Sequence, residues 1–231
     1  MQLLDKLPRE TGRDYALRTI KANIINLNLA PGSQISENEL ALEMGLSRTP
    51  VREALIELSK VKIVEIHPQK KSTVALIDYT LVDEARFLRN LLECAVVVLA
   101  CEKADARDVE RLRENVRLQN FYLDTRYSES LMALDNEFHH MLFEIAQKPQ
   151  VYALMQGISI HFDRVRSMAL SSVKDIKIVE DHACIVKAVE EHNEELARAL
   201  MEKHLNRYKF DEAAVRQTYP QFFPEQGEPS A

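Results

Sequence analysis

The sequence is poor in the residues that break helices and in those that crosslink small folds. Of its 231 residues only five are glycine, three are cysteine and none is tryptophan. Scarce glycine, with abundant leucine, alanine, glutamate, lysine and arginine, favours helices over sheets. Hydrophobic residues make up 46% of the chain, which excludes a disordered protein. The length suits two domains.

The three cysteines are too few and too unevenly spaced for a structural framework. They are Cys94, Cys101 and Cys184, and no CxxC pair occurs. An odd, sparse count argues against a disulfide scaffold and against a cysteine zinc site. Cys94 and Cys101 lie two turns apart on one face of an expected helix, about 10 Å, which is too far for a disulfide. We expect buried thiols in a reducing cytoplasm.

Long hydrophobic runs are also lacking. The run "CAVVVLAC" has eight residues and is flanked by Glu93 and Glu102. No stretch near the N-terminus has the length of a signal-peptide core. We therefore expect no secretion, no membrane span and a cytoplasmic location.

Charge differs between the front and the back of the chain. Residues 1–78 hold 11 Lys and Arg against 10 Asp and Glu, a balance of +1, and the remainder holds 19 against 26, a balance of −7. The direction of this difference suits a front domain that contacts nucleic acid.

The first 78 residues read as a winged helix-turn-helix. Apolar residues at helical spacing predict a first helix over 13–28. Ser36 and Glu39 form a capping box that opens a short helix through Met44, with Gly45 as its C-cap. Ser47 is expected to cap the next helix. The β-rich runs "KIVEI" and "TVALI", joined by "HPQKKS", predict a hairpin.

The rest of the chain has helical periodicity. We expect helices over 80–103, 106–123, 128–147, 149–170, 174–191 and 193–216, which would form an antiparallel α-helical bundle. The proline-rich stretch 219–231 is expected to be a loose tail. The predicted fold is mainly α, with a DNA-binding domain at 1–78 and a helical domain at 79–218.

The segment "GLSRTPVREAL" supplies the expected DNA-contacting side chains. Its apolar residues turn inward, which leaves Arg48, Thr49 and Arg52 at the exposed N-terminal end of a recognition helix. Arginine can pair with both guanine acceptors, and threonine can contact phosphate or a thymine methyl. We assign DNA contacts to these three residues, to Ser47 beside them, and to Lys70 and Lys71 at the hairpin tip.

Four residues of the second domain could form a metal site. Asp135 and His139 are one turn apart on one helix face. His182 and His204 lie at similar distances before and after a helical hairpin turn near residues 192–193, so their imidazoles could face each other. Three imidazoles and a carboxylate suit zinc, nickel, manganese or cobalt. From spacing alone, four unrelated polar residues remain the alternative.

Two parts of the sequence also resemble a known family. The stretch "LAPGSQISENELALEMGLSRTPVREALIELSK" resembles the N-terminal signature of GntR-superfamily transcription regulators, with Lys71 where that family usually has a wing glycine. "RNLLE", "DNEFHHML" and "EDHACIVKAV…ARALMEKHL" are similar to the all-helical FCD effector domain of the FadR-like branch. The resemblance implies a metal bound by Asp135, His139, His182 and His204, for which we expect zinc.

The resemblance and the residues together predict a regulator. We expect a homodimer that binds a two-fold symmetric DNA operator, represses transcription, and releases the DNA when a small carboxylate binds. Arg89 is a candidate effector ligand, although an ion pair with Glu93 one turn away explains it equally well. Arg164 and Arg166 have weaker claims to this role. A metal-dependent enzyme fused to a DNA-binding domain, and a direct metal sensor, are the alternatives. No general base stands beside the histidines, so we expect no enzyme.

Overall fold

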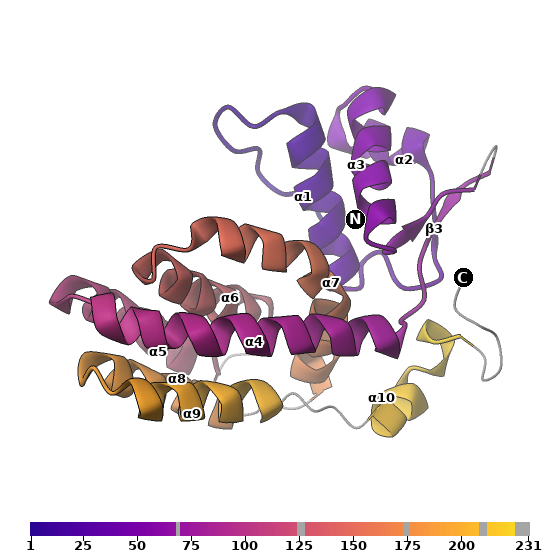
Figure 1. Cartoon of the computed structure of the whole chain (residues 1–231). Helices are drawn as coiled ribbons and strands as arrows, with labels where there is room; N and C mark the ends of the chain where they lie inside the picture. Colours follow the sequence, from indigo (N-terminus) through magenta and orange to yellow (C-terminus); the bar gives the residue numbers. More distant parts are fainter. Residues whose placement is uncertain (68–69, 124–127, 173–175, 208–211, 225–231) are drawn as a thin grey trace. The chain divides into compact units, whose positions relative to one another are not determined.

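The computed structural model describes residues 1–67, 70–123, 128–172, 176–207 and 212–224 (Figure 1). The chain forms two compact units. Unit 1 comprises Met1–Val82, Ile160–Ser167 and Asp211–Ala231, and unit 2 comprises Asp83–Ser159 and Met168–Phe210. The mainly helical fold class is confirmed.

Unit 1 contains the predicted winged helix-turn-helix. Its helices are α1 (Gly12–Ile25), α2 (Glu37–Met44) and α3 (Arg48–Lys60). The hairpin consists of β2 (Val64–Glu65) and β3 (Ser72–Val74). A further strand, β1 (Gln34–Ile35), pairs antiparallel with β3 and gives the order β1-β3-β2. The sequence does not predict β1, because two residues carry no periodicity.

Local chemistry sets the ends of these helices. The Ser36 side chain accepts the Glu39 amide at 3.4 Å, and Gly45 ends α2 in the left-handed region at φ 64°. Ser47 stands at the N-cap position of α3, as predicted, but its side chain makes no capping hydrogen bond. The third helical residue is Pro50, which has no backbone N–H to donate to the side chain of the capping residue.

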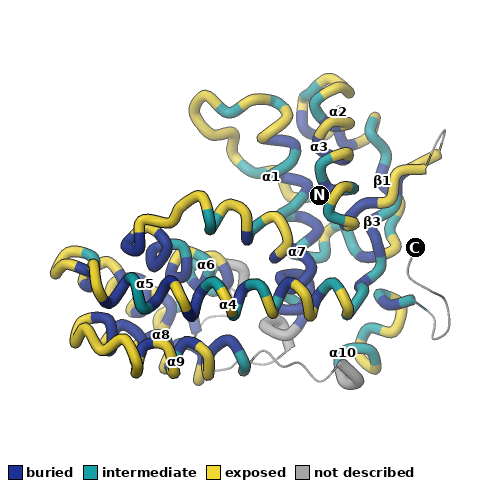
Figure 2. The backbone as a smooth tube through the Cα atoms, in the orientation of Figure 1, coloured by how far each residue is buried: buried dark blue, intermediate teal, exposed yellow. Residues whose placement is uncertain are grey.

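The core of unit 1 lies between α1 and α3. Ile20 and Ile24 of α1 and Val51 and Leu55 of α3 are all buried, as the tube in Figure 2 shows for these two helices. Each fully buried aliphatic side chain contributes about 1.5–3 kcal/mol by leaving water. This core fixes the position of α3, whose opposite face stays exposed.

Unit 2 is a helical bundle. Its helices are α4 (Tyr79–Lys103), α5 (Ala106–Leu123), α6 (Ser128–Ile145), α7 (Pro149–Ser172), α8 (Ile176–Glu190) and α9 (Glu194–Arg207), although the first residues of α4 and residues 160–167 of α7 belong to unit 1. Helix α5 packs on α6 and α8, and α8 packs on α9. Cys94 and Cys101 are buried free thiols in its core, as expected, but Cys184 is exposed, so the expectation of a buried thiol was wrong there.

The C-terminal part differs from the prediction. The sequence predicts one helix over 193–216, but α9 ends at Arg207 and a separate helix, α10 (Glu212–Thr218), follows. Within the expected loose tail, residues 220–222 form a 3₁₀ turn and Phe223 is buried against Tyr79, with ring centroids 5.6 Å apart. Residues 225–231 lie outside the described residues. The described part of the chain contains no helix apolar and long enough to cross a membrane.

Candidate functional site

Helix α3 and the β2–β3 wing of unit 1 enclose a groove of about 440 Å³. Arg48 and Arg52 of α3 line one side, and Lys70 and Lys71 line the other. Ser47 and Thr49 are exposed beside the two arginines. The structure therefore gathers these cationic side chains on one open surface.

Two of the basic side chains in this groove already have acidic neighbours. Arg48 lies 3.5 Å from the Glu37 carboxylate, and the Lys71 ammonium donates to Glu39 at 2.9 Å. All four side chains are at least a quarter exposed, so each pair contributes little to stability. Arg48 and Lys71 can therefore leave these carboxylates for another anion, such as a phosphate, with little loss of folding free energy.

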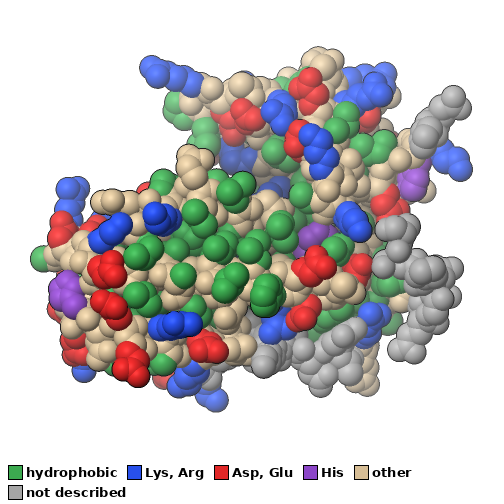
Figure 3. All heavy atoms as spheres, viewed as in Figure 1, with side chains coloured by type: hydrophobic (Ala, Val, Ile, Leu, Met, Phe, Trp, Pro, Cys, Tyr) green, Lys and Arg blue, Asp and Glu red, His purple; other side chains and the backbone are tan. Residues whose placement is uncertain are grey.

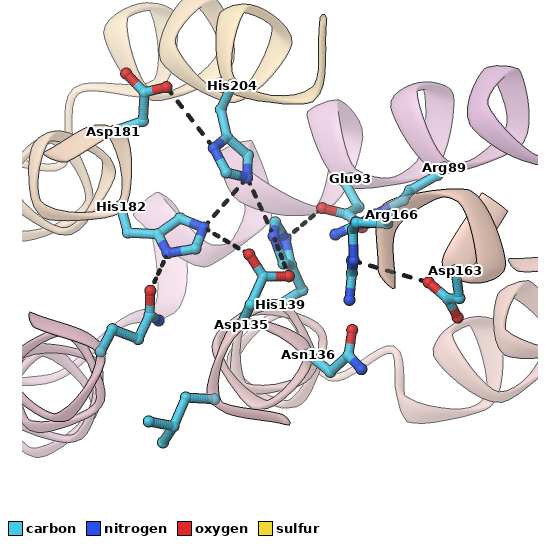
Figure 4. Close-up of polar contacts among 12 residues, drawn as sticks. Arg89, Glu93, Asp135, Asn136, His139, Asp163, Arg166, Asp181, His182 and His204 are labelled. Atoms are coloured by element: carbon cyan, nitrogen blue, oxygen red, sulfur yellow. Dashed lines mark hydrogen bonds and ion pairs between the residues drawn. The ribbon is translucent and has the colours of Figure 1, made fainter. Parts of the chain in front are cut away.

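A buried cluster of histidines lies at the centre of unit 2 (Figure 4). Asp135 and His139 come from α6, His182 from α8 and His204 from α9. One ligand atom from each of the four lies within 4.8 Å of the other three. The structure thus brings together the four residues named from the sequence.

The distances within this cluster fit a metal ion. The Nε2 atom of His204 lies 3.2 Å from that of His182 and 3.3 Å from that of His139. Two nitrogens at 2.0–2.1 Å from one tetrahedral zinc ion would lie roughly 3.3 Å apart. Asp135 oxygens lie 3.7 Å from His182 Nε2 and 3.9 Å from His139 Nε2. The cluster is consistent with a metal site.

The Nδ1 atoms of the three histidines point away from the cluster, toward oxygen atoms of residues that the sequence analysis did not identify as partners. His139 Nδ1 lies 2.5 Å from Glu93, His182 Nδ1 lies 2.7 Å from the Gln119 side-chain oxygen, and His204 Nδ1 lies 3.8 Å from Asp181. An acceptor at Nδ1 favours the tautomer whose Nε2 lone pair faces the cluster. The sequence contained a sign of the role of Gln119, because a polar residue within the apolar stripe of α5 needs a buried hydrogen-bond partner.

Arg89 forms the ion pair that the sequence left as one of two explanations. Its Nε donates to Glu93 at 2.6 Å, and both side chains are buried. Burial alone would raise the pKa of Glu93, but Arg89 and His139 lower that pKa to about 2. The carboxylate therefore stays charged beside His139.

Burial favours the neutral form of two histidines of the cluster, His139 and His182. It is the main cause that lowers the pKa of His139 and of His182, and the neighbouring His204 lowers the pKa of His182 further. Neutral imidazole is the form that binds metal.

The other arginine candidates have different surroundings. Arg164 donates to the Ala75 carbonyl at 2.7 Å, and Arg166 lies 3.9 Å from Asp163.

Two family models match the chain. The model of the bacterial regulatory proteins of the gntR family matches residues 15–74, and the FCD domain model matches residues 84–207. The FCD match covers more than half of the chain and includes the whole histidine cluster.

Whole-length relatives agree with these matches. An HTH-type transcriptional regulator from an unstable DNA locus of Streptomyces ambofaciens is 35% identical over 217 residues, which are 93% of this chain and 90% of that one. The HTH-type transcriptional repressor RspR of Escherichia coli K12 is 26% identical over 95% of this chain and 96% of its own. The solved structure of E. coli McbR/YncC shares the fold, with a TM-score of 0.79, 20% identity and coverage of 91% and 99%.

Proposed function

Because the chain belongs to the GntR family of transcription regulators and carries an FCD domain, we propose that it represses transcription and releases DNA on binding a small carboxylate. The family makes it a DNA-binding transcription regulator, and its relatives are regulators rather than enzymes. The observation that carries the proposal is the buried cluster of Asp135, His139, His182 and His204 in the FCD domain.

The DNA-binding half of the proposal rests on α3 and the wing. The exposed first turns of α3 present Ser47, Arg48, Thr49 and Arg52, a geometry suited to the major groove. Lys70 and Lys71 would contact the adjacent phosphate backbone from the wing. A single recognition helix reads one half-site, so we propose that a homodimer binds a two-fold symmetric operator.

The metal half rests on the chemistry of the cluster. Asp135, His139, His182 and His204 would hold one divalent ion, and three imidazoles with one carboxylate fit zinc best among zinc, nickel, manganese and cobalt. When bound, the ion supplies a positive centre with open positions for an anionic ligand. Gln119 and Glu93 fix the orientation of His182 and His139.

Arg89 is the proposed second contact of the carboxylate. Its guanidinium carries five N–H donors, and Nε serves Glu93. A guanidinium recognises carboxylates through charge-assisted hydrogen bonds, and Glu93 links Arg89 directly to His139 of the cluster, so Arg89 stands beside the place where the carboxylate would bind. An effector bound there changes DNA affinity only through its different affinities for two arrangements of the dimer, typically worth ~1–3 kcal/mol.

The test is a reciprocal binding experiment. A duplex selected from a random library by the full chain is titrated with metal-loaded and chelated protein at fixed salt, each with and without a panel of small carboxylates. A repressor of the proposed kind loses affinity only when metal and a carboxylate are both present. Release by metal alone would support a direct metal sensor. A carboxylate that binds without changing DNA affinity would contradict the proposal.

A further inference from the structure

Helix α7 is shared between the two units, and its first half contacts the helix that carries part of the histidine cluster. Residues 149–159 of α7 belong to unit 2, and residues 160–167 belong to unit 1. In unit 2 the Tyr152 hydroxyl donates to the carbonyl of Asn136 on α6 at 3.2 Å. Asn136 directly follows Asp135 of the cluster. The first half of α7 is therefore attached to α6 beside the proposed metal site.

The second half of α7 contacts two parts of the proposed DNA-binding surface. Within unit 1, His161 Nε2 lies 2.7 Å from the carbonyl oxygen of Val61, which is the C-cap residue of α3. Arg164 donates to the carbonyl of Ala75, the residue that follows β3, at 2.7 Å. The last carbonyls of a helix have no partner within that helix, so His161 satisfies a group that α3 itself cannot. The end of α3 and the base of the wing are thus both attached to α7.

Arg164 is unusual because it is fully buried without a carboxylate partner. Its exposed fraction is 0%, and burial lowers its pKa to about 10. Within the described residues its guanidinium has two acceptors, the Ala75 carbonyl and His161 Nδ1 at 3.5 Å. On the face that Figure 3 shows, lysine and arginine side chains lie at the surface, with acidic side chains near them. A buried charge without an ion partner lowers stability, which indicates that Arg164 has a role other than stability.

We infer that α7 couples the histidine cluster to the DNA-binding surface, and that Arg164 is the positioning residue through which a displacement of α7 reaches the wing and α3. The inference rests on the proposed function and names the path of its regulation. Helix shifts of about 1–2 Å are a common form of allosteric transition, and one continuous helix moves with both of its halves. Arg164 acts on the end of β3 directly, and on α3 through His161.

The choice of acceptors suits this role. A carbonyl oxygen and a neutral imidazole hold a guanidinium less tightly than a carboxylate does, because a carboxylate adds its own charge to the hydrogen bond. The contacts of Arg164 can therefore break and form again in a second arrangement of unit 1. The His161 ring fits the same scheme: its Nε2–H donates to the Val61 carbonyl, so its Nδ1 lone pair faces Arg164.

The experiment compares DNA affinity and stability in full-length variants. Arg164→Met removes the guanidinium and keeps an unbranched side chain. Arg107→Met on α5 is the matched control, because it removes the same charge from an exposed position. Each zinc-loaded protein is titrated with a duplex that the wild type selects from a random library, first alone and then with acetate, lactate, malate or succinate. Urea denaturation measures stability, and circular dichroism checks helical content.

We expect at least one carboxylate to lower the DNA affinity of the wild type and of Arg107→Met by about fivefold or more. In Arg164→Met the same carboxylate should change DNA affinity by less than about twofold, because the path to the wing and α3 is cut. The urea midpoint should change little, since methionine removes a buried charge but leaves two acceptors without a donor.

Three results would overturn the inference. If Arg164→Met responds to the carboxylate as the wild type does, Arg164 does not couple the two sites and the proposed function stands. A lower urea midpoint, with an equal loss of DNA affinity in the presence and absence of carboxylate, makes Arg164 a structural residue. A wild type that responds to none of the four carboxylates overturns the proposed function as well. Should Arg164→Met fail to fold, Tyr152→Phe decides, because it removes the hydroxyl that attaches α7 to α6 and should weaken the response in the same way.

Discussion

The Nε2 atoms of His182 and His204 lie 3.2 Å apart, although 22 residues separate them in the sequence. Helices α8 and α9 pack against each other around a turn in which His192 has a positive φ of 51°. That turn places the two histidines at the same height of the helical pair. Two buried imidazoles with facing nitrogens form a centre at which a cation can bind.

Removing either of these histidines should remove the metal. We expect His182→Ala and His204→Ala proteins to lose bound divalent metal, measured by elemental analysis after gentle purification. Chelation should lower the melting temperature of the wild type but not of these two variants, because metal at a hundredfold excess over its dissociation constant stabilises the fold by about 2.7 kcal/mol.

His140→Ala is the control for these variants. His140 neighbours His139 on α6 but stacks on Tyr152 with ring centroids 4.4 Å apart, away from the cluster. Its metal content should match the wild type. Equal metal content in the His182 and His204 variants would contradict the assigned site.

Gln119 should tune the site without touching the metal. Gln119→Met has a similar volume but removes the acceptor that orients His182 through Nδ1. Loss of such an orienting partner typically lowers metal affinity by about 10–100-fold. Competition with a chromogenic chelator measures this change. Asn120→Met on the same helix, at an exposed position, should leave the affinity unchanged.

His161 should make stability depend on pH. Burial, and then the Arg164 charge, lower the pKa of His161 to about 4 from its usual value of 6.5. Between these values the unfolded chain binds a proton that the folded chain does not, so stability present above pH 6.5 declines as pH falls towards 4. The full loss is on the order of 2–3 kcal/mol. His161→Gln should flatten this part of a urea-denaturation profile across pH, and an unchanged slope would contradict the assignment.

Arg52 should read the operator. Arg52→Ala should cost about 1–3 kcal/mol of affinity for a selected duplex if the side chain contacts a base, and should leave affinity for random DNA nearly unchanged. Fluorescence anisotropy at physiological salt measures both. Lys60→Ala, at the opposite end of α3, should change neither value. An equal loss on selected and random DNA would instead make Arg52 a phosphate contact.

The sequence determined the elements whose signals are local. Periodicity located α1, α3 and the helices of unit 2, and the Ser36 and Gly45 caps bounded α2 because capping depends on neighbouring residues. Ser47 is likewise the N-cap residue of α3, but its side chain makes no capping hydrogen bond, and Pro50, the third residue of that helix, has no amide to donate. Helical spacing also paired Asp135 with His139, and one hairpin turn paired His182 with His204, but the family resemblance was needed to assign the two pairs to one site.

Tertiary structure decided what depends on packing between distant segments. Strand β1 forms by pairing with β3, and the buried Phe223 ring stacks on Tyr79 from a distant part of the chain. Gln119 and Glu93 became partners of His182 and His139 because packed helices bring α5 and α4 to α8 and α6. Local propensity holds no information on such pairs. Their energy comes from excluding water between segments far apart in sequence, and only the folded chain brings those segments together.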